Sequence, residues 1–217
     1  MNGLFFIERL FGPEWQVALM QIFLVIFSVC CHEYAHARVA LWQGDSTAAD
    51  NGHLTLNPMK QMGLMSLLML GLIGIAWGQV PVRPEQMRKR YSEALVAFAG
   101  PAMNFLLFLG FALLASVARW KGWGESAEML FVLGAIINIV LFLFNMVPAP
   151  PLDGWNVFNY FFPRLFSFRT EVGKGLTIFL FLGALVFFNW FYAAGVWMLR
   201  IFNLGFVHLL VALGLVQ

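Results

Sequence analysis

Four long apolar runs constrain most strongly what this chain can fold into. They lie at roughly residues 15–43, 93–119, 127–148 and 174–198, and a shorter run follows at 201–216. A helix needs roughly 20 apolar residues to cross the hydrocarbon core of a bilayer. The chain is 61% hydrophobic and only 11% charged, a composition that excludes an ordinary soluble domain. We therefore expect an all-α polytopic membrane protein with about five transmembrane helices.

The segments between these runs show no sign of a second domain. No Gly/Ser-rich linker, charged tail or internal repeat divides residues 1–217, so we expect a single integral membrane domain with its core at 15–162. A short interfacial helix is expected at 3–11. The apolar run at 62–78 is short and interrupted by glycines, which indicates a re-entrant or interfacial segment. The helices in 174–216 fall outside the core and are candidates for a gate.

A histidine pair lies near the end of the first run, in "FSVCCHEYAHARVA" at 27–40. On a helix, His32 and His36 share one face because they are four residues apart, and Glu33 lies beside them. Two imidazoles and a neighbouring glutamate are what a hydrolytic zinc site needs, with the glutamate as general base. Ionisable groups at membrane depth cost about 2.5–3.5 kcal/mol each, and a metal ion would offset that cost. The alternative is a polar cluster satisfied by neighbouring helices.

A catalytic zinc ion needs a third protein ligand. The acidic candidates near the apolar runs are Asp45, Asp50, Glu93 and Asp153. We favour Asp153, since the prolines in "NMVPAPPLDG" end the preceding helix, and irregular backbone at membrane depth is tolerated only beside protein or a wet cavity. The alternative is a turn whose solvated aspartate caps a helix at 155–162.

Four motifs occur in order along the chain: "HEYAH", "LTLNPMK", "AFAGPAMNFLL" and "NMVPAPPLDG". Together they resemble the site-2 protease family of intramembrane zinc metalloproteases, in particular its small prokaryotic branch without accessory domains. The resemblance covers about residues 20–160. It implies a core of three transmembrane helices and cleavage of membrane-spanning substrates.

The resemblance also implies roles for individual residues. His32, His36 and Asp153 would hold one Zn²⁺ ion per chain, and Glu33 would be the catalytic base. Asn145 matches the asparagine that helps to bind substrate or the oxyanion in relatives.

One position departs from the family pattern. Many members of this branch have histidine three residues after the Asn-Pro pair, where this chain has Gln61. Glutamine is a poor zinc ligand, so any role of that histidine in metal binding or proton transfer is in doubt here. His53 is close in sequence and is a candidate for a polar role.

A shared metal ion fixes the topology. If His36 and Asp153 bind one ion, residues 44–92 must begin and end on the same side of the membrane, so 62–78 cannot cross; it must turn back at Gly71 or Gly74, or lie along the interface. The basic residues then divide nine to four, which predicts a cytoplasmic catalytic side. The catalytic side holds Arg38, Lys60, Arg83, Arg88, Lys89, Arg90, Arg164, Arg169 and Lys174, and the other side holds Arg9, Arg119, Lys121 and Arg200.

Two loop segments bear on substrate binding. "GHLTLN" at 52–57 alternates polar and apolar residues, which predicts a short strand beside the site. Its edge could pair with an unwound substrate, or it could be a local hairpin without such a role. The proline-containing segment at 79–84 is expected to be extended and to form the opposite lip. Asn104 is expected to be an interhelical hydrogen-bonding group.

The sequence therefore predicts an intramembrane zinc metalloprotease whose partners are a transmembrane protein or peptide and the lipid bilayer. A regulatory partner would supply the sensor that the chain lacks, and a net charge of +2 gives no reason to expect nucleic acid. Two other functions stay open: a membrane zinc hydrolase acting on a lipid or small amide, and an inactive relative that binds membrane helices as an adaptor. Ion transport is disfavoured, because no series of ionisable groups runs from one face to the other.

Overall fold

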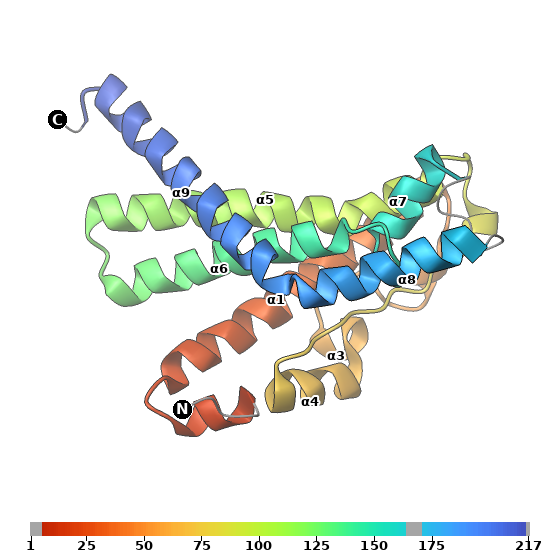
Figure 1. Ribbon diagram of the computed structural model, residues 1–217, viewed down its shortest axis with the longest axis horizontal. Coiled ribbons are helices and arrows are strands. Elements are labelled where there is room, and N and C mark those ends of the chain that lie inside the picture. The colour runs from red at the N-terminus through yellow and green to blue at the C-terminus, as the bar shows by residue number, and fades with distance from the viewer. Residues whose placement is uncertain (1–5, 164–170, 216–217) are drawn as a thin grey trace.

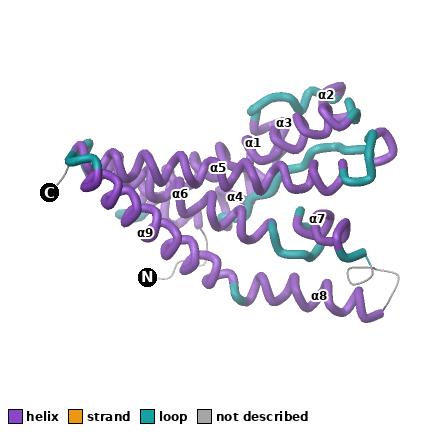
Figure 2. The backbone as a smooth tube through the Cα atoms, turned by 90° about the horizontal axis from the view of Figure 1, so that it is seen from above, coloured by secondary structure: helices purple, strands orange, loops and turns teal. Residues whose placement is uncertain are grey.

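The structure is a computed structural model that describes residues 6–163 and 171–215. Within these ranges the chain is helical, as expected, and it has no strand (Figure 2). The predicted interfacial helix is a 3-10 helix, and residues 3–5 of that prediction fall outside the described residues. The helices are η1 Phe6–Phe11, α1 Trp15–Gln43, α2 Thr47–Asp50, α3 Pro58–Gln61, α4 Gly63–Ile73, η2 Pro84–Gln86, α5 Ser92–Lys121, α6 Glu125–Asn145, α7 Gly154–Phe161, α8 Glu171–Val186 and α9 Phe188–Ala212.

Helices α1, α5 and α6 form the centre of the molecule. Helix α5 packs against both α1 and α6, and α1 also contacts α6, which confirms the expected core of three helices (Figure 1). The short turn at 122–124 forces α5 and α6 to run antiparallel. Their contact is apolar, with Phe108 and Ala112 of α5 against Ile139 of α6 and Leu199 of α9. This packing fixes how α5 lies across the histidine-bearing half of α1.

The predicted spans agree with the structure in the first part of the chain and differ near its end. Helices α1, α5, α6 and α9 are long and apolar enough to cross a membrane, whereas α8 is shorter. The predicted break between 198 and 201 is wrong, because the helices divide at Phe187. Arg200, which lies at the predicted break, is an exposed residue within α9. Inside a continuous apolar run, composition does not say where a helix ends.

Helix α8 contributes little to the central bundle. It contacts α9, and Figure 2 shows it lying apart from α5. Large apolar side chains on it are exposed, among them Phe179 and Leu182. Helix α8 therefore lies outside the core, whereas the expectation is wrong for α9, which packs against α5 and α6 through residues such as Leu199.

The apolar run at 62–78 turns back on itself and does not continue in one direction. Helix α4 ends at Gly74, whose φ of 79° is left-handed, a conformation that glycine adopts without steric cost. The chain then returns beside α4, because the Ser66 hydroxyl donates to the Trp77 carbonyl at 2.6 Å and accepts from the Trp77 N–H at 2.9 Å. The bend is therefore at Gly74 and not at Gly71.

The returning segment, residues 75–83, is called the return arm below. It has no helix or strand assignment, and the Gln79 N–H donates to the Gln61 carbonyl at 2.9 Å. At its end, the Arg83 N–H donates to Asp45 Oδ2 at 2.6 Å. Asp45 is fully buried and also accepts from the Thr47 N–H at 2.9 Å. Asp45 thus ties the return arm to the end of α1.

The structure does not confirm the strand predicted at 52–57. Among residues 6–163 and 171–215, no extended segment pairs with it as a strand. Instead the buried Gln61 side chain donates through Nε2 to the carbonyls of His53 and Thr55, at 2.8 and 2.6 Å. The carbonyls that a partner strand would have satisfied are bonded to one glutamine, so the alternating pattern forms a loop.

Asp45→Asn is expected to loosen the return arm, because the amide leaves either the Thr47 or the Arg83 N–H facing an NH₂ group. Losing a hydrogen bond to a charged group costs about 1.5–3 kcal/mol, measurable as a lower free energy of unfolding in detergent. Asp50→Asn is the control, because Asp50 is exposed and bonds only to Ser46. An equal effect of the two substitutions would contradict this account.

The same contacts predict a pH dependence. Burial alone would raise the pKa of Asp45, but the hydrogen bonds from Thr47 and Arg83 outweigh it and hold the pKa below its ordinary value. The stabilisation is therefore complete above about pH 4 and is lost as the pH falls through the folded-state pKa. The difference in stability between wild type and Asp45→Asn should shrink correspondingly at low pH.

Candidate metal centre

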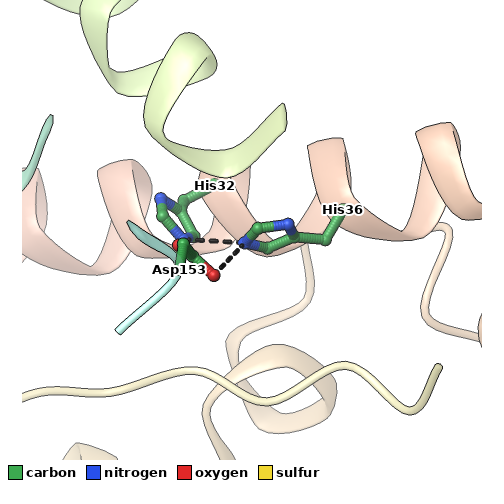
Figure 3. A group of neighbouring side chains, drawn as sticks. All are labelled: His32, His36 and Asp153. Carbon is green, nitrogen blue, oxygen red and sulfur yellow. Dashed lines mark hydrogen bonds and ion pairs between the residues drawn. The ribbon is translucent and has the colours of Figure 1, made fainter. Parts of the chain in front are cut away.

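Three predicted ligands meet at one point. The Nε2 atoms of His32 and His36 are 2.9 Å apart, Asp153 Oδ2 is 3.0 Å from His32 Nε2, and Asp153 Oδ1 is 3.4 Å from His36 Nε2. The group has ligand atoms within 4.8 Å of one another, and Figure 3 shows the carboxylate facing both rings. The structure thus brings together residues that are more than a hundred positions apart in the sequence.

Local structure explains why these side chains converge. His32 and His36 are one helical turn apart on α1. Asp153 follows the irregular segment after α6 and directly precedes α7, which packs against α5. The prolines therefore end one helix and the aspartate begins the next, at the level where α1 carries its histidines.

Each imidazole has a fixed partner on its far nitrogen. His36 Nδ1 is 2.7 Å from the Val96 carbonyl oxygen, and His32 Nδ1 is 2.6 Å from Asn104 Oδ1. A carbonyl oxygen accepts hydrogen bonds and never donates them, so in each ring Nδ1 carries the proton. Both Nε2 atoms then present a lone pair toward Asp153.

The atoms of these three side chains and the distances between them fit a metal ion. Two lone pairs and a carboxylate within 2.9–3.4 Å repel one another unless a cation lies among them, and Asp153 Oδ2 is buried without a hydrogen-bond partner. Zinc bonds of 2.0–2.2 Å in tetrahedral geometry separate ligand atoms by about 3.3 Å. Two imidazoles and one carboxylate, with a fourth position left for water, are the donor set of a catalytic zinc site.

Glu33 lies beside the ligands with its carboxylate free. Its side chain is 8% exposed and lines the central cavity, and within the described part of the chain it has no hydrogen bond or ion pair. The return arm passes so close that a Cβ placed on Gly78 would overlap the Glu33 carboxylate. Glu33 is therefore held between α1 and the arm, facing the cavity.

The cavity in front of these residues has a volume of about 510 Å³. Asn145 lines it as expected, although its Nδ2 donates to the Leu141 carbonyl at 3.0 Å, which leaves one N–H and the oxygen for other partners. Asn156 also lines the cavity. The sequence analysis did not identify Asn156; its position one turn after Asp153 was the available signal.

Gln61, which stands where many relatives have histidine, and the nearby His53 both make contacts in the structure. Gln61 is buried and holds the loop before it, as described above. His53 Nδ1 lies 3.4 Å from Gln61 Oε1, so its nearest polar partner is the glutamine.

Asn104 has a more specific role than the predicted interhelical contact. It does bridge helices, but it also accepts the Nδ1 proton of a candidate ligand. Helix α5 can come this close to α1 because residue 100 is glycine. A Cβ placed on Gly100 would overlap the Nε2 atoms of His36 and His32.

Known proteins resemble this chain over most of its length. "Putative zinc metalloprotease YwhC" of Bacillus subtilis is 35% identical over 65% of this chain and 68% of its own length. "Putative zinc metalloprotease Rip2" of Mycolicibacterium smegmatis is 33% identical over 60% of this chain and 52% of its own length. "Putative zinc metalloprotease sll0528" of Synechocystis is 30% identical over 67% of this chain and 32% of its own length.

No family model matches the chain. No solved structure matches it either.

An all-helical membrane protein with two histidines and an aspartate around one point, and a free glutamate beside them, has the fold and site of a membrane zinc metalloprotease. The chain belongs to the site-2 protease family of zinc metalloproteases, on its motifs and on its similarity to these relatives. Its cofactor is zinc.

Gly100→Ala is expected to abolish zinc binding, although it adds only a methyl group, because the new Cβ would occupy the space of both ring nitrogens. Zinc per chain, measured on purified protein, should fall from about one toward zero. Gly110→Ala is the matched control, since Gly110 lies on the same helix and a Cβ added there has nothing within 4 Å. Retention of one zinc per chain by Gly100→Ala would contradict the site geometry.

Proposed function

We propose that this protein is an intramembrane zinc metalloprotease that cleaves peptide bonds within or near the transmembrane segments of other proteins. The observation that carries the proposal is the convergence of three metal-binding atoms beside a free glutamate, inside a bundle of apolar helices. His32 lies eleven residues before the end of α1, which corresponds to about 16 Å of helix. The site is therefore recessed from the end of a spanning helix.

In this proposal His32, His36 and Asp153 hold the zinc ion. When bound, zinc polarises a carbonyl group and makes water acidic enough to lose a proton near neutral pH. Glu33 takes that proton and later delivers it to the leaving amine. Asn145 donates its remaining N–H to the oxygen of the scissile carbonyl as negative charge develops there.

The return arm is suited to hold the substrate in an extended form. The backbones of Trp77, Gln79 and Arg83 are bonded toward the protein. In an extended chain, alternate residues point their N–H and C=O groups to opposite sides. Gly78, Val80 and Val82 lie between these positions and line the cavity.

Within the described part of the chain, no hydrogen bond involves the backbone of Gly78, Val80 or Val82. An extended peptide can therefore add to this free edge as a strand. Strand addition would also expose the scissile bond, because a helical peptide bond is shielded by its own hydrogen bonding. The sequence analysis gave 52–57 the role of pairing with substrate. In this proposal that role belongs to the return arm, which overlaps the segment 79–84 that was expected to form the opposite lip.

The substrate in this proposal is a transmembrane protein or peptide, and a separate regulatory partner controls its delivery. The catalytic side is cytoplasmic, which the distribution of basic residues supports. Arg164 and Arg169 of that count lie outside the described residues.

A membrane zinc hydrolase for lipids or small amides would use the same metal centre. The free edge of the return arm favours a peptide, because a lipid has no backbone to pair with it. An inactive adaptor has no need of a free carboxylate such as Glu33 beside the ligands.

Glu33→Gln is expected to lower the rate of cleavage of a model transmembrane peptide by about 10²–10⁴-fold, since the amide cannot accept the proton. Zinc per chain should stay near that of the wild type, because Glu33 is not a ligand in this proposal. Glu93→Gln is the control, as Glu93 also lines the cavity but is exposed at its rim. Wild-type protein that leaves every peptide intact and cuts a lipid amide would contradict the protease assignment.

Val80→Pro is expected to raise the KM for peptide roughly tenfold, the effect of losing one hydrogen bond, because proline removes the N–H at the centre of the free edge. Val80→Ala removes similar side-chain volume and keeps that N–H, so its KM should be lower than that of Val80→Pro. Equal KM values for the two variants would show that substrate does not pair with the arm here.

A further inference from the structure

Three buried polar side chains lie behind the candidate metal centre, one on each helix of the core. Ser28 of α1, Asn104 of α5 and Asn138 of α6 are each 0% exposed. Asparagines in an apolar bundle are costly unless their donors and acceptors are paired. Their hydrogen bonds therefore decide which way each amide points.

The direction is set first at Asn138. Its Nδ2 donates to the Gly134 carbonyl at 2.9 Å and to Ser28 Oγ at 2.8 Å. The Gly134 oxygen is only an acceptor, so the NH₂ group of Asn138 must face it and the Oδ1 atom must face the other way. Rotating the amide by half a turn would bring two oxygens together.

Asn138 in turn orients Asn104. The remaining acceptor of Asn138, its Oδ1 atom, receives a hydrogen bond from Asn104 Nδ2 at 3.0 Å. The Ser28 carbonyl lies 3.5 Å from the same nitrogen and is also only an acceptor. Asn104 Oδ1 is therefore left to face His32 Nδ1, at 2.6 Å.

We propose that Asn138 is a positioning residue for the metal centre: it holds Asn104 with its oxygen toward His32, and so keeps the His32 proton on Nδ1 and the lone pair on Nε2. The proposal rests on the zinc site proposed above. The hydrogen bonds of Asn138 go to Asn104, Ser28 and Gly134 and not to a candidate ligand, yet without Asn138 the Asn104 amide is free to turn its NH₂ group toward the ring. The ring would then carry its proton on Nε2, where the metal must bind.

The test measures zinc affinity by competition with a chelator on purified protein. Partners in the outer shell of a zinc site typically change metal affinity by about 10–100-fold, and Asn138→Leu, of similar size without polar atoms, is expected to weaken zinc binding by about tenfold or more. Ser28→Ala should weaken it less, because the Gly134 carbonyl still orients Asn138. A dissociation constant for Asn138→Leu within twofold of the wild type would overturn the proposal.

Ser116→Ala is the matched control. Ser116 is buried on α5 and links it to α9 through Asn203 at 2.5 Å, so its loss also removes a buried interhelical hydrogen bond. It should lower stability without changing zinc affinity. Equal weakening of zinc binding by Ser116→Ala and Asn138→Leu would show a general loss of packing and would overturn the positioning role.

A second measurement does not need metal, and its decisive result comes from the wild-type protein. Nitrogen-15 NMR of the histidine rings in metal-free wild-type protein reports which nitrogen carries the proton, and His32→Gln identifies the signal. We expect Nδ1 of His32 to carry a proton in the wild type, where Asn104 Oδ1 accepts it, and neutral His32 to divide its proton between the two nitrogens in Asn138→Leu. A wild-type His32 ring without a proton on Nδ1 would overturn the proposal. Failure of the zinc site itself is separate: wild-type protein would then hold no zinc, whichever ring nitrogen is protonated.

Discussion

A buried imidazole can offer a lone pair on one nitrogen only if the proton on its other nitrogen has an acceptor. In this protein both acceptors come from α5: the Val96 carbonyl for His36 and the Asn104 side chain for His32. Helix α5 must therefore lie directly against the histidine face of α1, and Gly100 leaves the room for it. The packing of α5 against α1 therefore also determines which ring nitrogens are left to bind the metal.

The same constraint accounts for the path of the chain on the other side of the centre. Asp153 reaches the rings because α6 ends and the proline-containing segment turns back before α7. The return arm reaches Glu33 because α4 ends at a left-handed glycine and Asp45 holds the far end of the arm. Two irregular segments therefore meet at the cavity, where hydrogen bonds and contacts with neighbouring helices hold them in place.

These features make a coherent picture of a membrane zinc metalloprotease. Zinc fits among three atoms that would otherwise repel one another, a free carboxylate stands beside them, and an extended segment with an unpaired edge runs along the cavity. The buried Asn104 and Asn138 stand behind the ligands, where an apolar pair would have been simpler to bury. Their presence is explained if the orientation of one imidazole matters enough to offset the cost of burying two amides.

The sequence by itself determined the membrane setting, the spans of α1, α5 and α6, the histidine pair with Glu33, and the candidacy of Asp153. Hydropathy, helical spacing and proline chemistry are properties of neighbouring residues, so a single chain displays them directly. The tertiary structure alone decided that the chain divides at Phe187, that 52–57 forms a loop held by Gln61, and that Asn104 orients His32. Each of these depends on which groups share a hydrogen bond or a packing surface, and such partners, 72 positions apart for His32 and Asn104, leave no periodic trace in the sequence.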